Sequence, residues 1–224
     1  MSYFATNSIF RKRGFTLVEL LVTVTIIALI TAITVFNQND YSDRLALTKA
    51  ASDIELQIRE MQQYGVSVRE SSTNSGKFDY AYGITINLNS AVTGTMGQYN
   101  LWSFVDINNS TRYNPPSGWA TCPNNSTSEC VATTSLKYNV KIIDLCAINS
   151  SGGQNCKSNG GSGVPGRIDV TFKRPNLGAI FAFNNTSGNP VAFPNHRGAK
   201  IRIQSPRGKT MDIYIYTTGQ VSVQ

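Results

Sequence analysis

The chain has 224 residues, a formal net charge of +7 and 41% hydrophobic residues. An N-terminal anchor of about 36 residues would leave roughly 190, enough for one soluble domain with its own core. The chain has a single histidine, His196, and no H-E-x-x-H motif. Both facts argue against the common histidine-dependent catalysts, so we expect no enzyme and no metal or cofactor.

The first predicted element is an apolar segment, residues 15–36, with one ionisable side chain, Glu19. As an α-helix, its 22 residues extend about 33 Å, which matches a bilayer core of about 30 Å. Three consecutive cations, residues 11–13, come directly before it. The positive-inside rule therefore keeps residues 1–13 in the cytoplasm and exports the chain after residue 36. A carboxylate in such a segment costs about 2 to 3 kcal/mol, so Glu19 is expected to have a function.

The string RGFTLVE at residues 13–19 lies between this basic leader and the apolar segment. It resembles the processing site of type IV pilins and type II secretion pseudopilins. The resemblance implies that a prepilin peptidase cleaves after Gly14 and that Phe15 is then N-methylated. It also implies that Glu19 pairs with the new N-terminal amine of the same or a neighbouring subunit, because opposite charges attract strongly at low dielectric constant. The other implied partners are further pilin or pseudopilin subunits, the inner-membrane assembly platform and the membrane.

One alternative stays open for this segment. It could be an uncleaved signal anchor, with Glu19 reaching towards the membrane surface. Many family members carry a proline within the apolar helix, but this chain has none before Pro115. Because residues 37–40 are the only polar break, we expect a kink or local melting near residues 36–41.

After residue 36, apolar residues recur at alternating spacings of four and three, which predicts an amphipathic helix that reaches about residue 70. The stripe consists of Leu47, Ala51, Ile54, Ile58, Met61, Gly65 and Val68. We interpret this stripe as core packing under a globular domain.

From about residue 78 the period falls to two, which predicts β-strands at residues 80–88, 99–106, 136–146, 167–173, 179–183, 199–204, 211–216 and 220–223. Residues 107–135 and 147–166 are expected to be loops. A long N-terminal helix packed on an antiparallel sheet is an α+β class and is again the architecture of pilins. The C-terminal string GKTMDIYIYTTGQVSVQ resembles the final hairpin of GspH/FimU-type minor pilins, which favours a minor subunit.

The four cysteines, Cys122, Cys130, Cys146 and Cys156, lie among polar residues and lack the close C-x₂₋₄-C pairs of a zinc site. In an exported domain we expect two disulfides, and of three connectivities we favour the local pairs Cys122–Cys130 and Cys146–Cys156. Four reduced, buried thiols are the alternative.

Residues 157–209 contain nine cations and one acid, whereas residues 40–70 contain six acids and four cations. The basic segment could bind DNA, could contact the acidic helix of a neighbouring subunit, or could simply be solvated. The candidate contact residues are Lys173, Arg174, Arg197, Lys200, Arg202, Arg207 and Lys209.

The sequence therefore predicts a leader peptide at residues 1–14, a transmembrane or filament-core helix at 15–36, an amphipathic half-helix at 37–70 and a β-rich domain at 71–224. The resemblance implies a structural pilin or pseudopilin, membrane-inserted first and part of a pilus or pseudopilus after assembly. The alternative is a permanently anchored extracytoplasmic domain whose basic face binds DNA or surface ligands.

Overall fold

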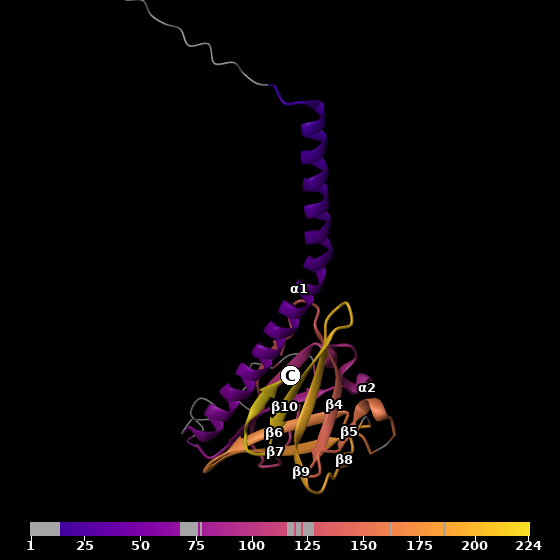
Figure 1. The fold of residues 1–224 in the computed structure, drawn as a ribbon. Coiled ribbons are helices and arrows are strands. Elements are labelled where there is room, and N and C mark those ends of the chain that lie inside the picture. The colour runs from indigo at the N-terminus through magenta and orange to yellow at the C-terminus, as the bar shows by residue number, and fades with distance from the viewer. Residues whose placement is uncertain are drawn as a thin grey trace, which may run out of the picture. The chain divides into compact units, whose positions relative to one another are not determined.

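The computed structural model describes residues 14–67, 76, 78–115, 119, 122, 128–161, 163–185 and 187–224. The predicted leader therefore lies almost wholly outside the described residues. A single long helix, α1 (Leu17–Val66), starts the described part of the chain (Figure 1). The chain divides into two compact units, Met1–Ser42 and Asp43–Gln224, and each contains part of α1.

The helix is unbroken through residues 36–41, so the expectation of local melting there is wrong. No proline or glycine lies in that stretch, so each residue there can keep its place in the backbone hydrogen bonding of an α-helix. Of the predicted helix, residues 68–70 lie outside the described part of the chain.

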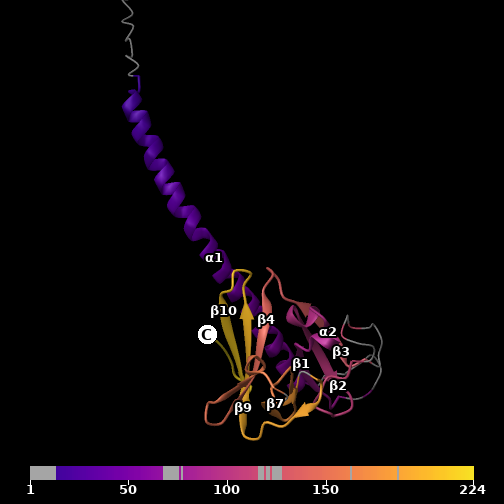
Figure 2. The same cartoon turned by 90° about the vertical axis from the view of Figure 1, so that its right-hand side faces the viewer.

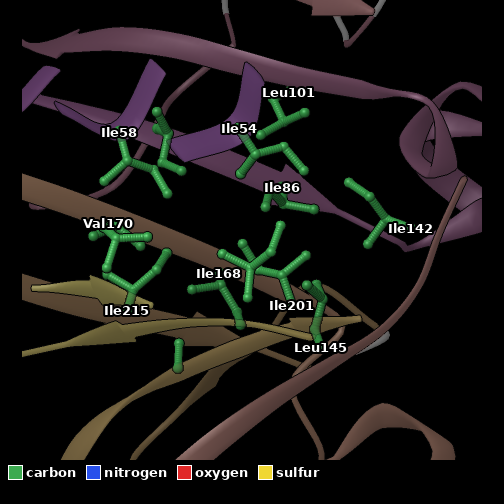
Figure 3. Close-up of a cluster of buried hydrophobic side chains, with 14 of the residues drawn as sticks. Ile54, Ile58, Ile86, Leu101, Ile142, Leu145, Ile168, Val170, Ile201 and Ile215 are labelled. Atoms are coloured by element: carbon green, nitrogen blue, oxygen red, sulfur yellow. The ribbon is translucent and has the colours of Figure 1, made fainter. Parts of the chain in front are cut away.

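The predicted apolar stripe is buried. Leu47, Ala51, Ile54, Ile58 and Met61 are each at most 2% exposed. Figure 3 shows Ile54 and Ile58 within the cluster of buried apolar side chains that the β-strands complete. Each isoleucine or leucine buried in this way contributes about 1.5 to 3 kcal/mol, so the stripe attaches this half of α1 firmly to the domain.

The domain consists of two antiparallel sheets (Figure 2). The six-stranded sheet has the order β3-β2-β1-β6-β7-β8, and the five-stranded sheet has the order β11-β10-β9-β4-β5. The strands of the first are β1 (Ala81–Asn87), β2 (Asn100–Asp106), β3 (Cys130–Ser135), β6 (Arg167–Lys173), β7 (Asn176–Asn184) and β8 (Pro190–Val191). Those of the second are β4 (Lys141–Asn149), β5 (Gln154–Cys156), β9 (His196–Gln204), β10 (Thr210–Tyr216) and β11 (Val221–Val223). Short helices are α2 (Ser90–Thr93), η1 (Met96–Gln98) and η2 (Lys157–Asn159).

Alternate residues of both sheets form the main core with α1. Ile84 and Ile86 of β1, and Ile201 of β9, are at most 1% exposed. Alternate apolar residues point into this core, as the two-residue period of a strand requires. All seven residues of β1 are buried, so its other face is covered as well. The sequence prediction of an α+β fold, with a long helix on antiparallel sheet, is confirmed.

The sequence prediction missed three strands and placed the start of another strand too early. Strands β3 and β5 lie inside segments expected to be loops, and β8 has only two residues. The strand expected from residue 136 begins at Lys141, because Tyr138 and Asn139 have positive φ values of 60° and 57° and form a turn. Strands β3, β5 and β8 all lie at sheet edges, where half-exposed short strands give little hydrophobic alternation.

The two disulfides join Cys122 to Cys130 and Cys146 to Cys156, which are the local pairs favoured from the sequence. Cys146 and Cys156 face each other directly across β4 and β5. Their sulfurs lie close to the carboxylate of Asp144, a group that could suggest a metal site. Because both sulfurs are in the disulfide, the thiolates that a metal would need are absent.

A second, smaller core covers the other face of the six-stranded sheet. Trp102 and Phe104 of β2 pack there with Tyr113 and Trp119 from the following loop. The guanidinium of Arg167 lies 4.9 Å from the Trp119 ring centroid and also donates to a carboxylate oxygen of Asp169 at 2.9 Å. Burial raises the pKa of the Tyr113 hydroxyl to about 12. The cluster holds this loop against the sheet.

One glycine of α1 determines how closely the helix approaches the six-stranded sheet. A Cβ atom on Gly65 would lie 2.3 Å from the backbone oxygen of Phe172 in β6. That backbone oxygen cannot move without disturbing the strand. The helix therefore needs a residue without a side chain at this position.

We predict that Gly65→Ala destabilises the protein by about 1 to 3 kcal/mol, the cost of forcing a side chain into a packed contact. At an unobstructed helix position the same change stabilises by about 1 kcal/mol. Urea unfolding measures the difference. Gly163→Ala is the matched control, because a Cβ there meets no atom within 4 Å. Equal stabilities of the two variants would contradict the close contact.

Candidate functional site

The segment in front of α1 is exposed and lacks regular structure. Gly14, Phe15 and Thr16 precede the first helical residue, and Phe15 is 72% exposed. A side chain at Gly14 would meet no atom within 4 Å. Proteases cut exposed, irregular backbone most readily, and the bond between Gly14 and Phe15 has that character.

Thr16 caps the helix that follows. Its hydroxyl oxygen accepts a hydrogen bond from the backbone N–H of Glu19 at 3.3 Å, and its carbonyl oxygen accepts from Leu20 at 3.2 Å. The pattern Thr-x-x-Glu is the capping-box signature of a helix N-terminus. Thr16 was not among the predicted site residues, although this capping pattern is present in the sequence. The helix start therefore lies directly after the Gly14–Phe15 bond.

Glu19 lies in the first turn of α1, where the helix dipole favours a negative charge. Within the part of the chain that the structure describes, its carboxylate has no ion-pair partner. Its neighbours along the helix are exposed and apolar. An unpaired carboxylate on an apolar surface is costly once water is removed, so the site is suited to a cation supplied from outside these residues.

The first half of α1 exposes its apolar side chains on every face. The large apolar residues from Leu17 to Val35 are between 46% and 81% exposed. This part of the helix is long and apolar enough to cross a membrane, and none of it is buried in the domain. The hydroxyls of Thr23, Thr25, Thr31 and Thr34 donate to carbonyl oxygens three or four residues earlier. Those donors are therefore satisfied without water, as lipid or a protein interior requires.

Two of the seven candidate basic residues lie together on β9 and share one acid. Arg202 donates to the carboxylate of Asp212 at 2.7 and 2.8 Å, and the Nζ of Lys200 lies 3.7 Å from the same carboxylate. The hydrogen bonds from Arg202 lower the pKa of Asp212, and the same bonds raise the pKa of Arg202. Lys200 is only 5% exposed. Much of the positive charge at this place is therefore used inside the domain.

The other five lie in three further places. Lys173, the last residue of β6, donates a hydrogen bond to the side chain of Asn109. Arg174, the next residue, donates a hydrogen bond to the carbonyl oxygen of Phe78. Arg207, in the turn after β9, lies 3.7 Å from Asp43, and Lys209 is in the same turn. Arg197, at the start of β9, lies 6.0 Å from the centroid of the Tyr216 ring. The structure thus divides the basic segment among several surfaces.

The N-terminal segment of the chain matches a known family model. A family model of the prokaryotic N-terminal methylation motif matches residues 9–35, which include Gly14, Phe15, Glu19 and the exposed apolar helix. No curated protein and no solved structure gives a significant match. This motif and the exposed apolar helix that follows it support a membrane-anchored precursor similar to the type IV pilins and pseudopilins.

The pKa of Asp212 predicts a pH dependence of stability. A carboxyl whose pKa is lowered in the folded state stabilises the fold above its ordinary pKa, and this contribution is lost as the pH falls through the lowered value. We expect Asp212→Asn to reduce the free energy of unfolding by about 1 kcal/mol at neutral pH, with a smaller difference in acid. Urea unfolding at pH values from acid to neutral measures this difference in the free energy of unfolding. Asp79→Asn is the control, because the Asp79 carboxylate is 80% exposed and lies 3.9 Å from Arg174. A constant difference at all pH values would contradict the assignment.

Proposed function

We propose that this chain is a minor pilin or pseudopilin, cleaved after Gly14, N-methylated at Phe15 and assembled into a pilus or a type II secretion pseudopilus. The observation that carries the proposal is the motif match at residues 9–35, followed by a capped, exposed apolar helix whose carboxylate, on Glu19, has no ion-pair partner among the described residues. Such a helix needs lipid or other subunits around it. The function is structural, and no catalytic step by this chain is required.

The membrane orientation follows from charge. The three cations at residues 11–13 would stay in the cytoplasm, and the domain would be exported. Two disulfides suit an oxidising compartment outside the cytoplasm. Prepilin peptidase would act at the cytoplasmic face of the membrane, next to the exposed Gly14–Phe15 bond. The inner-membrane assembly platform would then move the chain into the filament.

During assembly, the apolar half of α1 would exchange lipid for the helices of other subunits. Cleavage would create an ammonium on Phe15, four residues before Glu19. An ammonium and a carboxylate stabilise each other in a low-dielectric interior, where either one alone is costly. Pairing with the amine of the same or a neighbouring subunit would set the axial position of the chain in the filament.

Two features support a minor subunit of the GspH/FimU type. Strands β10 and β11 form the hairpin that the resemblance of the C-terminal string implies. The domain also has two disulfides, one from Cys122 to Cys130 at the start of β3 and one across the β4–β5 hairpin. A role as a permanently anchored DNA-binding domain is less well supported, because the candidate cations are dispersed and Arg202 and Lys200 share an acid.

We predict that Gly14→Ser blocks processing in cells with an active prepilin peptidase. The fold tolerates the change, because a side chain at Gly14 meets no atom within 4 Å, so any loss of cleavage reflects recognition by the peptidase. Mass spectrometry of the N-terminus should find a methylated peptide beginning at Phe15 in the natural protein and the intact leader in the variant. A normally shortened variant, or a natural protein that keeps its leader, would refute the proposed site.

We predict that Glu19→Ala leaves membrane insertion intact and reduces incorporation into filaments at least about tenfold, since an unpaired buried ammonium is strongly destabilising. Immunoblots of membrane and sheared-filament fractions measure both. Glu19→Gln separates two roles, because glutamine also fits a capping box but carries no charge. If charge pairing matters, Glu19→Gln fails like Glu19→Ala. If glutamine restores assembly, the role of Glu19 is helix capping instead.

A further inference from the structure

A small hollow lies where the β4–β5 hairpin meets the chain that leads into β9. It has a volume of about 240 Å³ and is lined by Asn149, Gln154, Asn155, Phe193, Pro194 and His196, together with Ala147, Ile148 and Gly153. A backbone hydrogen bond from the N–H of Ser150 to the carbonyl oxygen of Asn195 joins its two walls, and one from the N–H of Asn149 to the carbonyl oxygen of Gly153 closes the β4–β5 hairpin. The walls are therefore held in place before any ligand binds.

Each polar side chain that lines the hollow uses one of its two polar atoms in a hydrogen bond within the protein. The Nδ1 of His196 lies 2.8 Å from the carbonyl oxygen of Phe193. A carbonyl only accepts, so Nδ1 carries the proton, and in the neutral ring Nε2 is an acceptor. The Nδ2 of Asn155 donates to the carbonyl of Gly163, and the Oδ1 of Asn149 accepts from Ser151.

Gln154 is positioned by a buried cation. Its Oε1 accepts a hydrogen bond from the Nζ of Lys200, a side chain only 5% exposed, and Asp212 lies 3.7 Å from that Nζ on its other side. The side-chain oxygen of Gln154 is thus already hydrogen-bonded to Lys200, and its NH₂ group remains available to donate to a ligand. Among the described residues, the hollow therefore offers two amide NH₂ donors, on Asn149 and Gln154, and two acceptors, on Asn155 and His196.

Charge and size restrict the ligand. None of the lining side chains is ionised when His196 is neutral, and the nearby ammonium of Lys200 is already balanced by Asp212. A phosphate or carboxylate would find no free counter-charge. The volume is below the range of about 300–1,000 Å³ that is usual for drug-sized ligands, so the hollow accepts one small ring. The Phe193 ring and Pro194 supply an apolar wall.

We propose that this hollow binds one neutral sugar residue. Each sugar hydroxyl both donates and accepts, which matches the mixed amide donors and the acceptors on Asn155 and His196. The carbon-bound hydrogens of the ring suit the face of Phe193. The hollow lies at the start of β9, and the turn after the other end of this strand contacts Asp43 of α1. A nine-residue strand spans about 30 Å, so the hollow and Asp43 lie near opposite ends of β9. This binding goes beyond filament assembly and does not depend on it.

Saturation-transfer NMR on the full-length chain tests the proposal. The protein is held in dodecylphosphocholine, a detergent without a sugar headgroup, and neutral hexoses and N-acetylhexosamines are added singly. Nucleosides and sugar phosphates form a comparison set. We expect at least one neutral sugar to receive saturation and to titrate with a millimolar Kd. Absence of transfer to every neutral sugar, or transfer only to nucleosides or sugar phosphates, would overturn the proposal.

Variants place the ligand in the hollow. Asn155→Ala removes an acceptor and Phe193→Leu removes the aromatic wall, and each should raise the Kd about tenfold or more. Asn108→Ala changes an exposed asparagine in the loop after β2 and should leave the Kd unchanged. Thermal unfolding checks that each variant is folded. Equal Kd values in all three variants would show that the sugar binds elsewhere. Glu19→Ala should bind sugar normally, so a failure of filament assembly and a failure of this site can be told apart.

Discussion

The two halves of α1 must satisfy different surroundings, and the rest of the structure follows from that constraint. The large apolar side chains from Leu17 to Val35 are exposed on every face of the helix, so they need lipid or other subunits. From Leu47 onwards only one stripe is apolar, and both sheets contribute to the core that buries it. The order of elements, the close contact at Gly65 and the position of the domain core all depend on this change of pattern along one helix.

The site at the helix start combines three physical features in six residues. An exposed bond lies between Gly14 and Phe15, Thr16 begins the helix, and Glu19 adds a charge in the first turn. The cap fixes where the helix begins in the precursor, independently of any partner. Cleavage would supply the cation that the described residues do not offer Glu19. The same glutamate can therefore serve helix formation before processing and subunit pairing afterwards.

Two carboxyl groups of the domain change its stability in opposite directions as the pH rises. Arg202 lowers the pKa of Asp212, so this pair favours the fold at neutral pH. Burial raises the pKa of Asp169, despite the nearby Arg167, so its ionisation costs stability as the pH rises. Arg167 also contacts the Trp119 ring and holds the aromatic loop. Counting cations along the sequence cannot separate these structural roles from free surface charge.

The sequence alone determined the processing motif, the helix, its buried stripe and most strands, and it favoured the local cysteine pairs among three connectivities. Each of these is encoded by neighbouring residues, through short motifs or the periods of helix and strand. Only the tertiary structure decided the edge strands β3, β5 and β8, the sharing of Asp212 by Lys200 and Arg202, and the aromatic cluster around Arg167. It alone revealed the hollow beside His196, which joins residues about 40 positions apart. These features depend on strand register and on contacts between distant segments, and residue order does not specify such contacts locally.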